Sequence, residues 1–319
     1  MAVNGDARDK ESFDIAGLII EHCSSYVYLG SVFTSDGSTK TAIEEQYRLK
    51  IKHLHKLINF LMKNCDFPFS VKRRVVEAAF NAAILYGCEG WLGASCHIMD
   101  KLYITAVKCL LGVRKTTAND LCLAETGLPP LQALVRHKQQ KFITSMINKT
   151  ASIQDDPFRF ALELTHTGNA TMSRYINTSL SVNNHIAEAR DKLHERIRTS
   201  ICTKFITYRD INPTMTVHDI YDINNRCIVP EHYRVAFTRL RLSSHNLRIE
   251  TGRWSRLPRE RRLCPCGAVQ DEKHVLELCT LTEHLRTQYP QQVAYPHILR
   301  NANNQRDFKY LFDVINVYM

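Results

Sequence analysis

The segment CPCGAVQDEKHVLELC, from Cys264 to Cys279, holds three cysteines and one histidine within sixteen residues. Its spacing is Cys-x-Cys-x7-His-x4-Cys, and three thiolates with one imidazole form a closed tetrahedral set that suits a structural zinc ion. Gly267 follows the second cysteine, where a tight turn around a metal needs a permissive backbone. The alternative is a reduced cysteine cluster, because the proline of Cys-Pro-Cys removes a backbone donor to sulfur. The predicted zinc ligands are Cys264, Cys266, His274 and Cys279.

The composition is typical of a soluble globular protein. The 319 residues, 44% apolar and 23% charged, suffice for two or three domains with buried cores. No run approaches eighteen uncharged apolar residues, and the polar start MAVNGDARDKESFD lacks the apolar centre of a signal peptide. We therefore expect an intracellular protein of the nucleus or cytoplasm, without a membrane partner, whose eleven cysteines are mostly reduced.

Positive charge is concentrated just before the cysteines. The net charge is +10, and residues 234–262 contribute +7 of it, with nine arginines against two glutamates. These arginines are Arg234, Arg239, Arg241, Arg248, Arg253, Arg256, Arg259, Arg261 and Arg262. A charge run is often a solvated face, but clustered arginines need an anion, and the planar guanidinium suits phosphate. The run predicts RNA or DNA as the partner.

The same segment predicts a helix over residues 231–249, a break at Gly252 and a basic extended arm that leads into the cysteines. Four apolar residues share one face of that helix: Tyr233, Phe237, Leu240 and Leu247. Arg234, Arg241 and Arg248, spaced by seven, form a neighbouring basic stripe that can reach phosphates while the apolar face packs.

Trp254 lies among these arginines and has two interpretations. The indole could stack on an unpaired base, or it could cover the small core of the cysteine cluster. With it, the predicted nucleic-acid-binding residues are Arg234, Arg241, Arg248, Arg253, Trp254, Arg256, Arg259, Arg261 and Arg262.

Three regions of the chain resemble one protein family. LRLSSHNLRIETGRW (240–254) with RLCPCGAVQDEKHVLELC (262–279) resembles the C-terminal zinc-knuckle region of non-LTR (LINE-type) retrotransposon reverse transcriptases. SSYVYLGSVFTSDGS (24–38) and AAILYGCEGW (82–91) resemble the primer-grip hairpin and the thumb of the same enzymes. LLGVRKTTANDLCLAETGLPPLQALV (110–135) resembles the linker of some of these elements. The matches follow the order of the family.

The resemblance implies the rear part of a reverse transcriptase, without its palm and fingers. Polymerase chemistry needs carboxylates that hold two magnesium ions, and the family supplies them from a palm aspartate and a Tyr-x-Asp-Asp hairpin. The only Asp-Asp pair here, Asp155–Asp156, precedes Pro157 and predicts a helix N-cap. Glu44 and Glu45 predict a solvent-facing helix turn. We therefore expect no catalytic residues and no enzymatic activity of the chain on its own.

Sequence periodicity predicts a mainly α fold. Residues 17–34 predict one β-hairpin around a polar turn, and Asp36-Gly37 predicts a second turn. Ser70 is predicted to cap a helix that Gly87 ends. The predicted helices cover residues 39–63, 71–86, 97–111, 120–126, 130–148, 184–208, 216–223, 231–249, 280–288 and 306–317.

We expect a helical thumb and linker bundle with a short N-terminal β-hairpin and a small C-terminal zinc-knuckle module. The predicted segments are a disordered N-terminus (1–14), a primer-grip hairpin with thumb-like helices (15–150), a polar linker (151–182) and a helical C-terminal domain (183–319). Basic residues on the helix over 39–63 either solubilise its surface or lie along a primer–template duplex.

Three functions remain open. The arginine run, the zinc spacing and the resemblance favour a nucleic-acid-binding fragment that holds RNA or DNA without chemistry of its own. A second possibility is a polymerase part that acts in trans with a separate palm-bearing reverse transcriptase chain. A third is a zinc-stapled protein-interaction module without a role in nucleic-acid binding.

Overall fold

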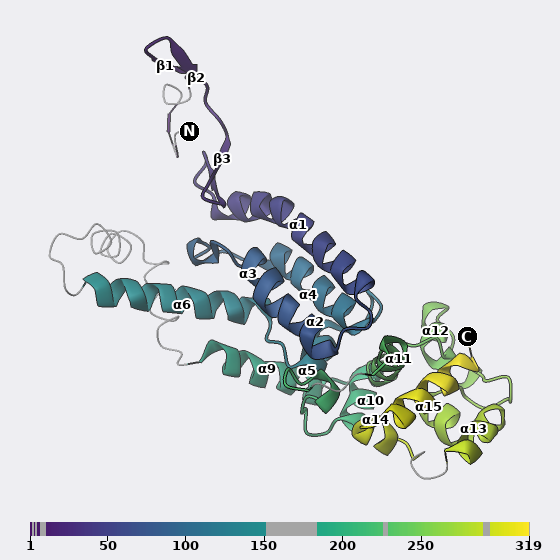
Figure 1. Ribbon diagram of the computed structural model, residues 1–319. Helices are drawn as coiled ribbons and strands as arrows, with labels where there is room; N and C mark the ends of the chain where they lie inside the picture. Colours follow the sequence, from purple (N-terminus) through teal and green to yellow (C-terminus); the bar gives the residue numbers. More distant parts are fainter. Residues whose placement is uncertain are drawn as a thin grey trace. The chain divides into compact units, whose positions relative to one another are not determined.

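Thirteen α-helices and two small antiparallel hairpins make up the part of the chain that the computed structural model describes (Figure 1). The described residues are 1, 3, 5–6, 11–150, 184–225, 229–289 and 294–318. The mainly α fold class is confirmed. The predicted linker at 151–182 and the predicted helix cap at Asp155–Asp156 lie outside the described residues. Among the helices that are described, none is long and apolar enough to cross a membrane.

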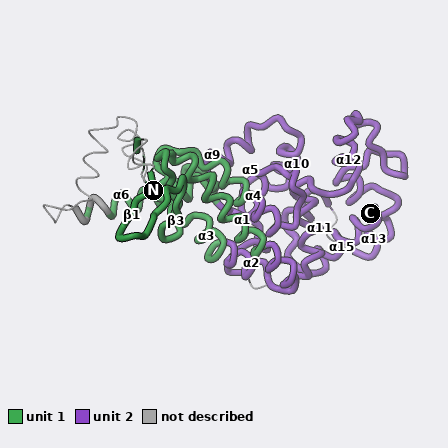
Figure 2. Tube along the Cα trace, turned by 90° about the horizontal axis from the view of Figure 1, so that it is seen from above, with its two compact units in different colours: residues 1–57, 77–103, 129–189 green, residues 58–76, 104–128, 190–319 purple. Residues whose placement is uncertain are grey.

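The chain divides into two units (Figure 2). Unit 1 comprises Met1–Leu57, Glu77–Tyr103 and Pro129–Ala189. Unit 2 comprises Ile58–Val76, Ile104–Leu128 and Arg190–Met319, and it contains the predicted zinc ligands and all nine arginines of the basic run. The predicted segment boundaries stay a prediction.

Unit 1 begins with two β-hairpins where the sequence predicted one. β1 (Phe13–Ile15) pairs with β2 (Leu18–Ile20), and β3 (Ser25–Tyr28) pairs with β4 (Ser31–Thr34). The turns are Ala16-Gly17 and Leu29-Gly30, and all four residues have positive φ, from 48° to 86°, as two-residue hairpin turns of type I′ require. The single-hairpin prediction is wrong because the polar segment before β3 joins two hairpins instead of turning one.

α1 (Thr39–Lys63) has its predicted bounds and anchors the second hairpin. Its residue Ile43 is buried, and the buried side chain of Gln46 donates a hydrogen bond of 3.2 Å to the carbonyl oxygen of Gly30. The predicted turn at Asp36-Gly37 precedes the helix, with Gly37 at a φ of 63°. The periodicity of this segment was therefore sufficient to locate it.

The predicted helix over 71–86 is a run of three elements. α2 (Phe69–Val75) is followed by a π-helical turn (Val76–Phe80) and by α3 (Asn81–Ile84). The prediction that Ser70 caps this helix is wrong, because Pro68 precedes α2 and Ser70 is buried inside it. The next two helices, α4 (His97–Leu111) and α6 (Leu131–Thr150), follow their predicted ranges closely.

Unit 2 is built from short helices, with most of α9 among them. They are α2, α5 (Asn119–Thr126), α9 (His185–Thr199), α10 (Thr203–Ile211), α11 (Glu231–Arg241), α12 (Arg248–Trp254), α13 (Glu283–Gln288), α14 (His297–Asn301) and α15 (Gln305–Asn316). A 3-10 turn (Asp219–Tyr221) replaces the helix predicted over 216–223. Phe237 of α11 packs edge to face on Phe308 of α15, with ring centroids 5.0 Å apart, and both side chains are buried.

The predicted helix over 184–208 is two helices, α9 and α10. Cys202, between them, is extended with φ −66° and ψ 129°. The guanidinium of Arg209 donates to the carbonyl oxygens of Ile197, at 3.1 Å, and of Ser200, at 2.9 Å. It thereby satisfies carbonyl groups that the end of α9 leaves unpaired. Helical periodicity alone does not reveal such an arginine cap.

The predicted helix over 231–249 is also two helices, α11 and α12. Ser243 has a φ of 47°, which is incompatible with a continuing helix. His245, in the connecting loop, is buried, and its Nε2 lies 2.8 Å from a carboxylate oxygen of Glu272. The loop therefore packs against the residues around the cysteine cluster.

Candidate metal centre and basic surface

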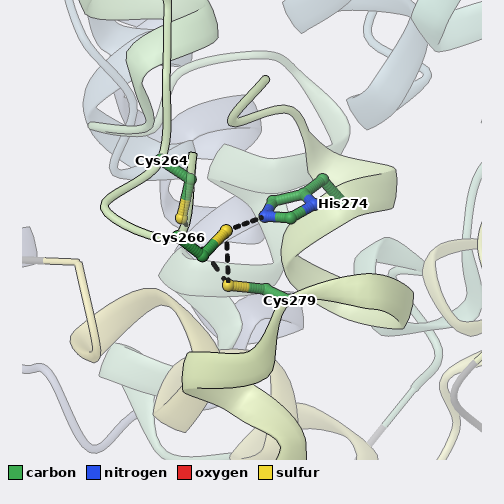
Figure 3. Close-up of side chains that lie close together, drawn as sticks. All are labelled: Cys264, Cys266, His274 and Cys279. Atoms are coloured by element: carbon green, nitrogen blue, oxygen red, sulfur yellow. Dashed lines mark hydrogen bonds between the residues drawn. The ribbon is translucent and has the colours of Figure 1, made fainter. Parts of the chain in front are cut away.

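Cys264, Cys266, His274 and Cys279 come together as predicted, with their ligand atoms all within 4.8 Å of one another (Figure 3). The Sγ of Cys279 lies 3.6 Å from that of Cys264 and 3.7 Å from that of Cys266. The Nε2 of His274 lies 3.1 Å from the Sγ of Cys266. Disulfide sulfurs are about 2.05 Å apart, so these thiols are free. Ligands of a tetrahedral zinc ion lie about 3.5–3.8 Å from one another, so this cluster could hold a metal ion after small shifts.

A tight turn places the first two cysteines. Leu263 and Val269 form an antiparallel β-bridge, and the amide of Cys264 donates to the carbonyl oxygen of Ala268 at 2.7 Å. Gly267 has a φ of 94°, and its amide donates to the carbonyl oxygen of Cys264 at 2.9 Å. The left-handed backbone needed here explains the glycine after Cys-Pro-Cys.

A π-helical turn (His274–Leu278) places the other two ligands. The amide of Cys279 donates to the carbonyl oxygen of His274 at 2.8 Å, which closes the turn with a bond across five residues. The carboxylate of Asp271 accepts a 2.9 Å hydrogen bond from the amide of His274 and so caps the start of the turn. A π-helical turn is wider than an α-helical turn, which suits the five-residue separation between His274 and Cys279.

Gln270 links the cluster to α12. Its buried side chain directs Nε2 at the Sγ of Cys264, 3.7 Å away, and its Oε1 accepts a 2.7 Å hydrogen bond from the amide of Arg248. Its carbonyl oxygen accepts a bond of 3.1 Å from the amide of Ile249. The start of α12 is therefore tied directly to a candidate metal ligand.

Burial shifts the ionisation of two of the candidate ligands. It raises the pKa of the Cys264 thiol to about 11 and lowers the pKa of His274 below its usual range. A neutral imidazole is the form that binds metal, whereas the thiols must lose their protons on binding. Binding of a metal ion at this centre is therefore coupled to the release of thiol protons.

Arg234 and Arg241 lie in the core of unit 2, each with a side chain only 2% exposed. The Nη2 of Arg241 donates to a carboxylate oxygen of Glu125 in α5 at 2.9 Å. The Nη2 of Arg234 donates to Glu231 at 2.6 Å and to the carbonyl oxygen of Leu110 at 3.2 Å. The prediction that these two arginines reach phosphates is wrong, because both guanidinium groups are enclosed and bonded internally.

Glu125 is the residue that sequence analysis missed. It is fully buried, and it accepts hydrogen bonds from Arg241 and from the buried hydroxyl of Tyr208, the latter at 2.9 Å. Burial alone would lower the pKa of Arg241, but the charge of Glu125 outweighs this and raises it. A single carboxylate within the apolar segment LCLAET was a usable signal, because a buried carboxylate requires a cation.

Arg262 and Gly252 form a clamp beside the cluster. The Arg262 guanidinium donates to the carbonyl oxygens of Leu257, at 2.7 Å and 2.9 Å, and of Ile249, at 2.9 Å. A Cβ added at Gly252 would lie 2.6 Å from the Cγ of Arg262, so the glycine lets the arginine stem approach. The predicted helix break at Gly252 is wrong, since α12 continues through it. The predicted phosphate contact by Arg262 is also disfavoured, because its donors are engaged within unit 2.

The other predicted arginines lie at or near the surface. Arg248, Arg256 and Arg261 are exposed, and their guanidinium groups have no hydrogen bond or ion pair within the described parts of the chain. Arg259 is exposed and pairs with Asp271 at 2.6 Å. We call Arg248, Arg253, Arg256, Arg259 and Arg261 the basic surface. Trp254 is 61% exposed, so it does not cover the core of the cysteine cluster.

No family model, no curated protein and no solved structure matches the chain. Among the described residues, the four-residue cluster is also the only group of three or more Cys, His, Asp or Glu side chains close enough to share a metal ion. The function is therefore argued from this cluster and the basic surface beside it.

Proposed function

We propose that this chain binds RNA or DNA through the basic surface, which a structural zinc ion holds in place. In this proposal it works as the C-terminal part of a non-LTR retrotransposon reverse transcriptase. The observation that carries the proposal is Gln270, whose side chain contacts both the Sγ of Cys264 and the amide of Arg248. A metal ion that fixes the cysteine turn thereby also fixes the start of the helix that bears Arg248, Arg253 and Trp254.

The donor set favours zinc as the metal. Three thiolates and one imidazole form a set typical of structural zinc sites, and all four positions of a tetrahedral ion are filled by protein atoms. No position remains for a water molecule or a substrate, so the ion has a structural role. In this proposal the cluster is the zinc knuckle expected from the sequence.

The basic surface supplies the contacts to nucleic acid. Three of its arginines, Arg248, Arg256 and Arg261, lack internal partners in the part of the chain that the structure describes, and a guanidinium group binds phosphate through a planar fork of donors. Contacts to phosphate position a strand without reading its sequence, so we expect weak sequence preference.

The salt dependence of binding tests this proposal. If about five phosphates are neutralised on a single strand, log K should fall against log salt with a slope of roughly −3.5. Replacing Arg248, Arg256 and Arg261 by Ala should make the slope shallower by about two units, because each single-strand contact contributes about 0.7. A matched control removes three exposed cations from α9 and α15: Arg198, Arg306 and Lys309. An equal change in both triple variants would contradict the proposed surface.

The two alternatives differ from this proposal in measurable ways. Binding to neither RNA nor single-stranded DNA at low salt would favour a zinc-stapled protein-interaction module. Extension of a primed RNA template by a mixture with a palm-bearing chain would favour action in trans. We expect the chain alone, with magnesium and deoxynucleotides, to extend no primer, and extension abolished by Asp155→Ala or Asp156→Ala would identify a catalytic pair instead of a helix cap.

A further inference from the structure

An exposed tryptophan ends α12. Trp254 is 61% exposed, whereas the other tryptophan of the chain, Trp91, is 6% exposed. An indole normally buries most of its large apolar surface. Trp254 therefore presents a ring to solvent next to the arginines of the basic surface.

Arg114 covers one face of this ring. Its guanidinium carbon lies 4.6 Å from the Trp254 ring centroid, a cation–π distance. The arginine is held at two points, since its amide donates to the Oγ of Ser244 at 3.0 Å and its guanidinium donates to the side-chain oxygen of Asn246. Because Arg114 takes one face, the solvent-exposed area belongs to the opposite face and the edge of the indole.

The charges around Arg114 leave a positive excess. Burial and the neighbouring Arg239 lower the pKa of Arg114, although a guanidinium stays charged at neutral pH. The carboxylate that acts on it, Glu250, is already shared by Lys204, at 2.7 Å, and by Arg253, at 3.3 Å. Four cations (Arg114, Arg239, Lys204 and Arg253) thus face the single carboxylate of Glu250. This positive excess favours an anionic ligand beside Arg114.

We infer that Trp254 and Arg114 form a stacking site for one unpaired base of single-stranded RNA or DNA. The base stacks on the free face of the indole, and the positive excess around Arg114 attracts the adjoining phosphates. Bases inside a duplex are already stacked on one another, so the site selects single strands. This inference rests on the proposed function and adds Arg114, which the sequence did not indicate, to the binding residues.

Two oligonucleotides of equal length and phosphate number test the inference, one with bases and one abasic throughout. The test uses the full chain and both RNA and DNA versions. The oligonucleotide with bases should bind roughly 5- to 150-fold more tightly, which corresponds to stacking of one base. Its binding should also quench the fluorescence of Trp254. The emission of the buried Trp91 should stay constant and serves as the internal reference.

Variants assign the effect to the ring. Trp254→Ala should remove the preference for bases and the quenching, while Trp254→Phe should retain part of the preference because it keeps an aromatic face. Arg114→Gln should reduce the preference, since the indole loses its support and one cation. Arg306→Ala is the matched control: that guanidinium carbon lies 5.4 Å from the ring centroid of Tyr289, and we expect no change in the preference for bases.

The outcomes separate this inference from the proposed function. Equal affinity for the two oligonucleotides, with binding still sensitive to salt, would overturn the stacking site and leave phosphate binding intact. Binding of neither oligonucleotide would overturn the proposed function as well. Retention of a polyglutamate peptide in a manner that depends on Trp254, without retention of nucleic acid, would replace the base by a protein ligand.

Discussion

Two parts of one arginine run have opposite surroundings. In α11, Arg234 and Arg241 are enclosed and bonded to carboxylates. In and after α12, Arg248, Arg256 and Arg261 face solvent without internal partners in the described residues. From composition these side chains form one basic region. In the structure some of them are buried cations and the others are surface cations.

The position of the carboxylates explains the division. The partner of Arg241, Glu125, lies 116 positions earlier in the chain, so only the tertiary fold brings the two side chains together. Near the surface arginines, Glu250 is already engaged by Lys204 and Arg253. A buried guanidinium needs internal partners such as these carboxylates. Arg248, Arg256 and Arg261, which have none within the described residues, stay in solvent and are available to an external anion.

Removal of the metal should be the change that most disorders the segment bearing the surface arginines. The purified chain should hold one zinc ion, and Cys279→Ser should release it, because the small turn around the ion depends on it for folding. We expect faster hydrogen exchange over about residues 255–285 and at the start of α12, which Gln270 ties to Cys264, with α11 unchanged. Cys202→Ser changes an exposed thiol outside the cluster and is the control. Equal zinc content in wild type and Cys279→Ser would contradict the assigned ligands.

Loss of one core arginine should have a smaller but clear effect. Arg241→Ala leaves Glu125 buried without its cation, which should lower the free energy of unfolding by about 3–5 kcal/mol. Arg261→Ala, at the surface, should change it by less than about 0.5 kcal/mol. Urea denaturation measures both values.

A double replacement sharpens this comparison. Glu125→Leu with Arg241→Met removes both charges and keeps apolar volume, so it should recover most of the stability that Arg241→Ala loses. A cost for Arg241→Ala no greater than that for Arg261→Ala would contradict the division of the run.

Much of the local structure could be predicted from the sequence. The bounds of α1 followed from its apolar period, and the four candidate metal ligands followed from their spacing and from Gly267. These features depend on residues close together in the chain. Such features can be predicted from patterns in a short stretch of sequence.

Three of the errors came from side-chain contacts that helical periodicity does not record. The end of α9 depends on Arg209, which follows in the next helix, and the burial of Arg241 depends on Glu125. Likewise, Gly252 suggested a helix break, but it is required for the approach of Arg262. In each case a side chain from elsewhere decides the local structure, and no periodicity records it.

Arginine side-chain NMR tests the division of the run most directly, because it reports on each guanidinium in one sample. On titration with a short single-stranded oligonucleotide, the Nε–Hε signals of Arg248, Arg256 and Arg261 should shift in proportion to binding. The signals of Arg234 and Arg241 should be protected from solvent exchange and should keep their positions, because their partners are internal. Shifts of Arg234 and Arg241 together with an unchanged Arg248, Arg256 and Arg261 would contradict the division and place the nucleic-acid surface elsewhere.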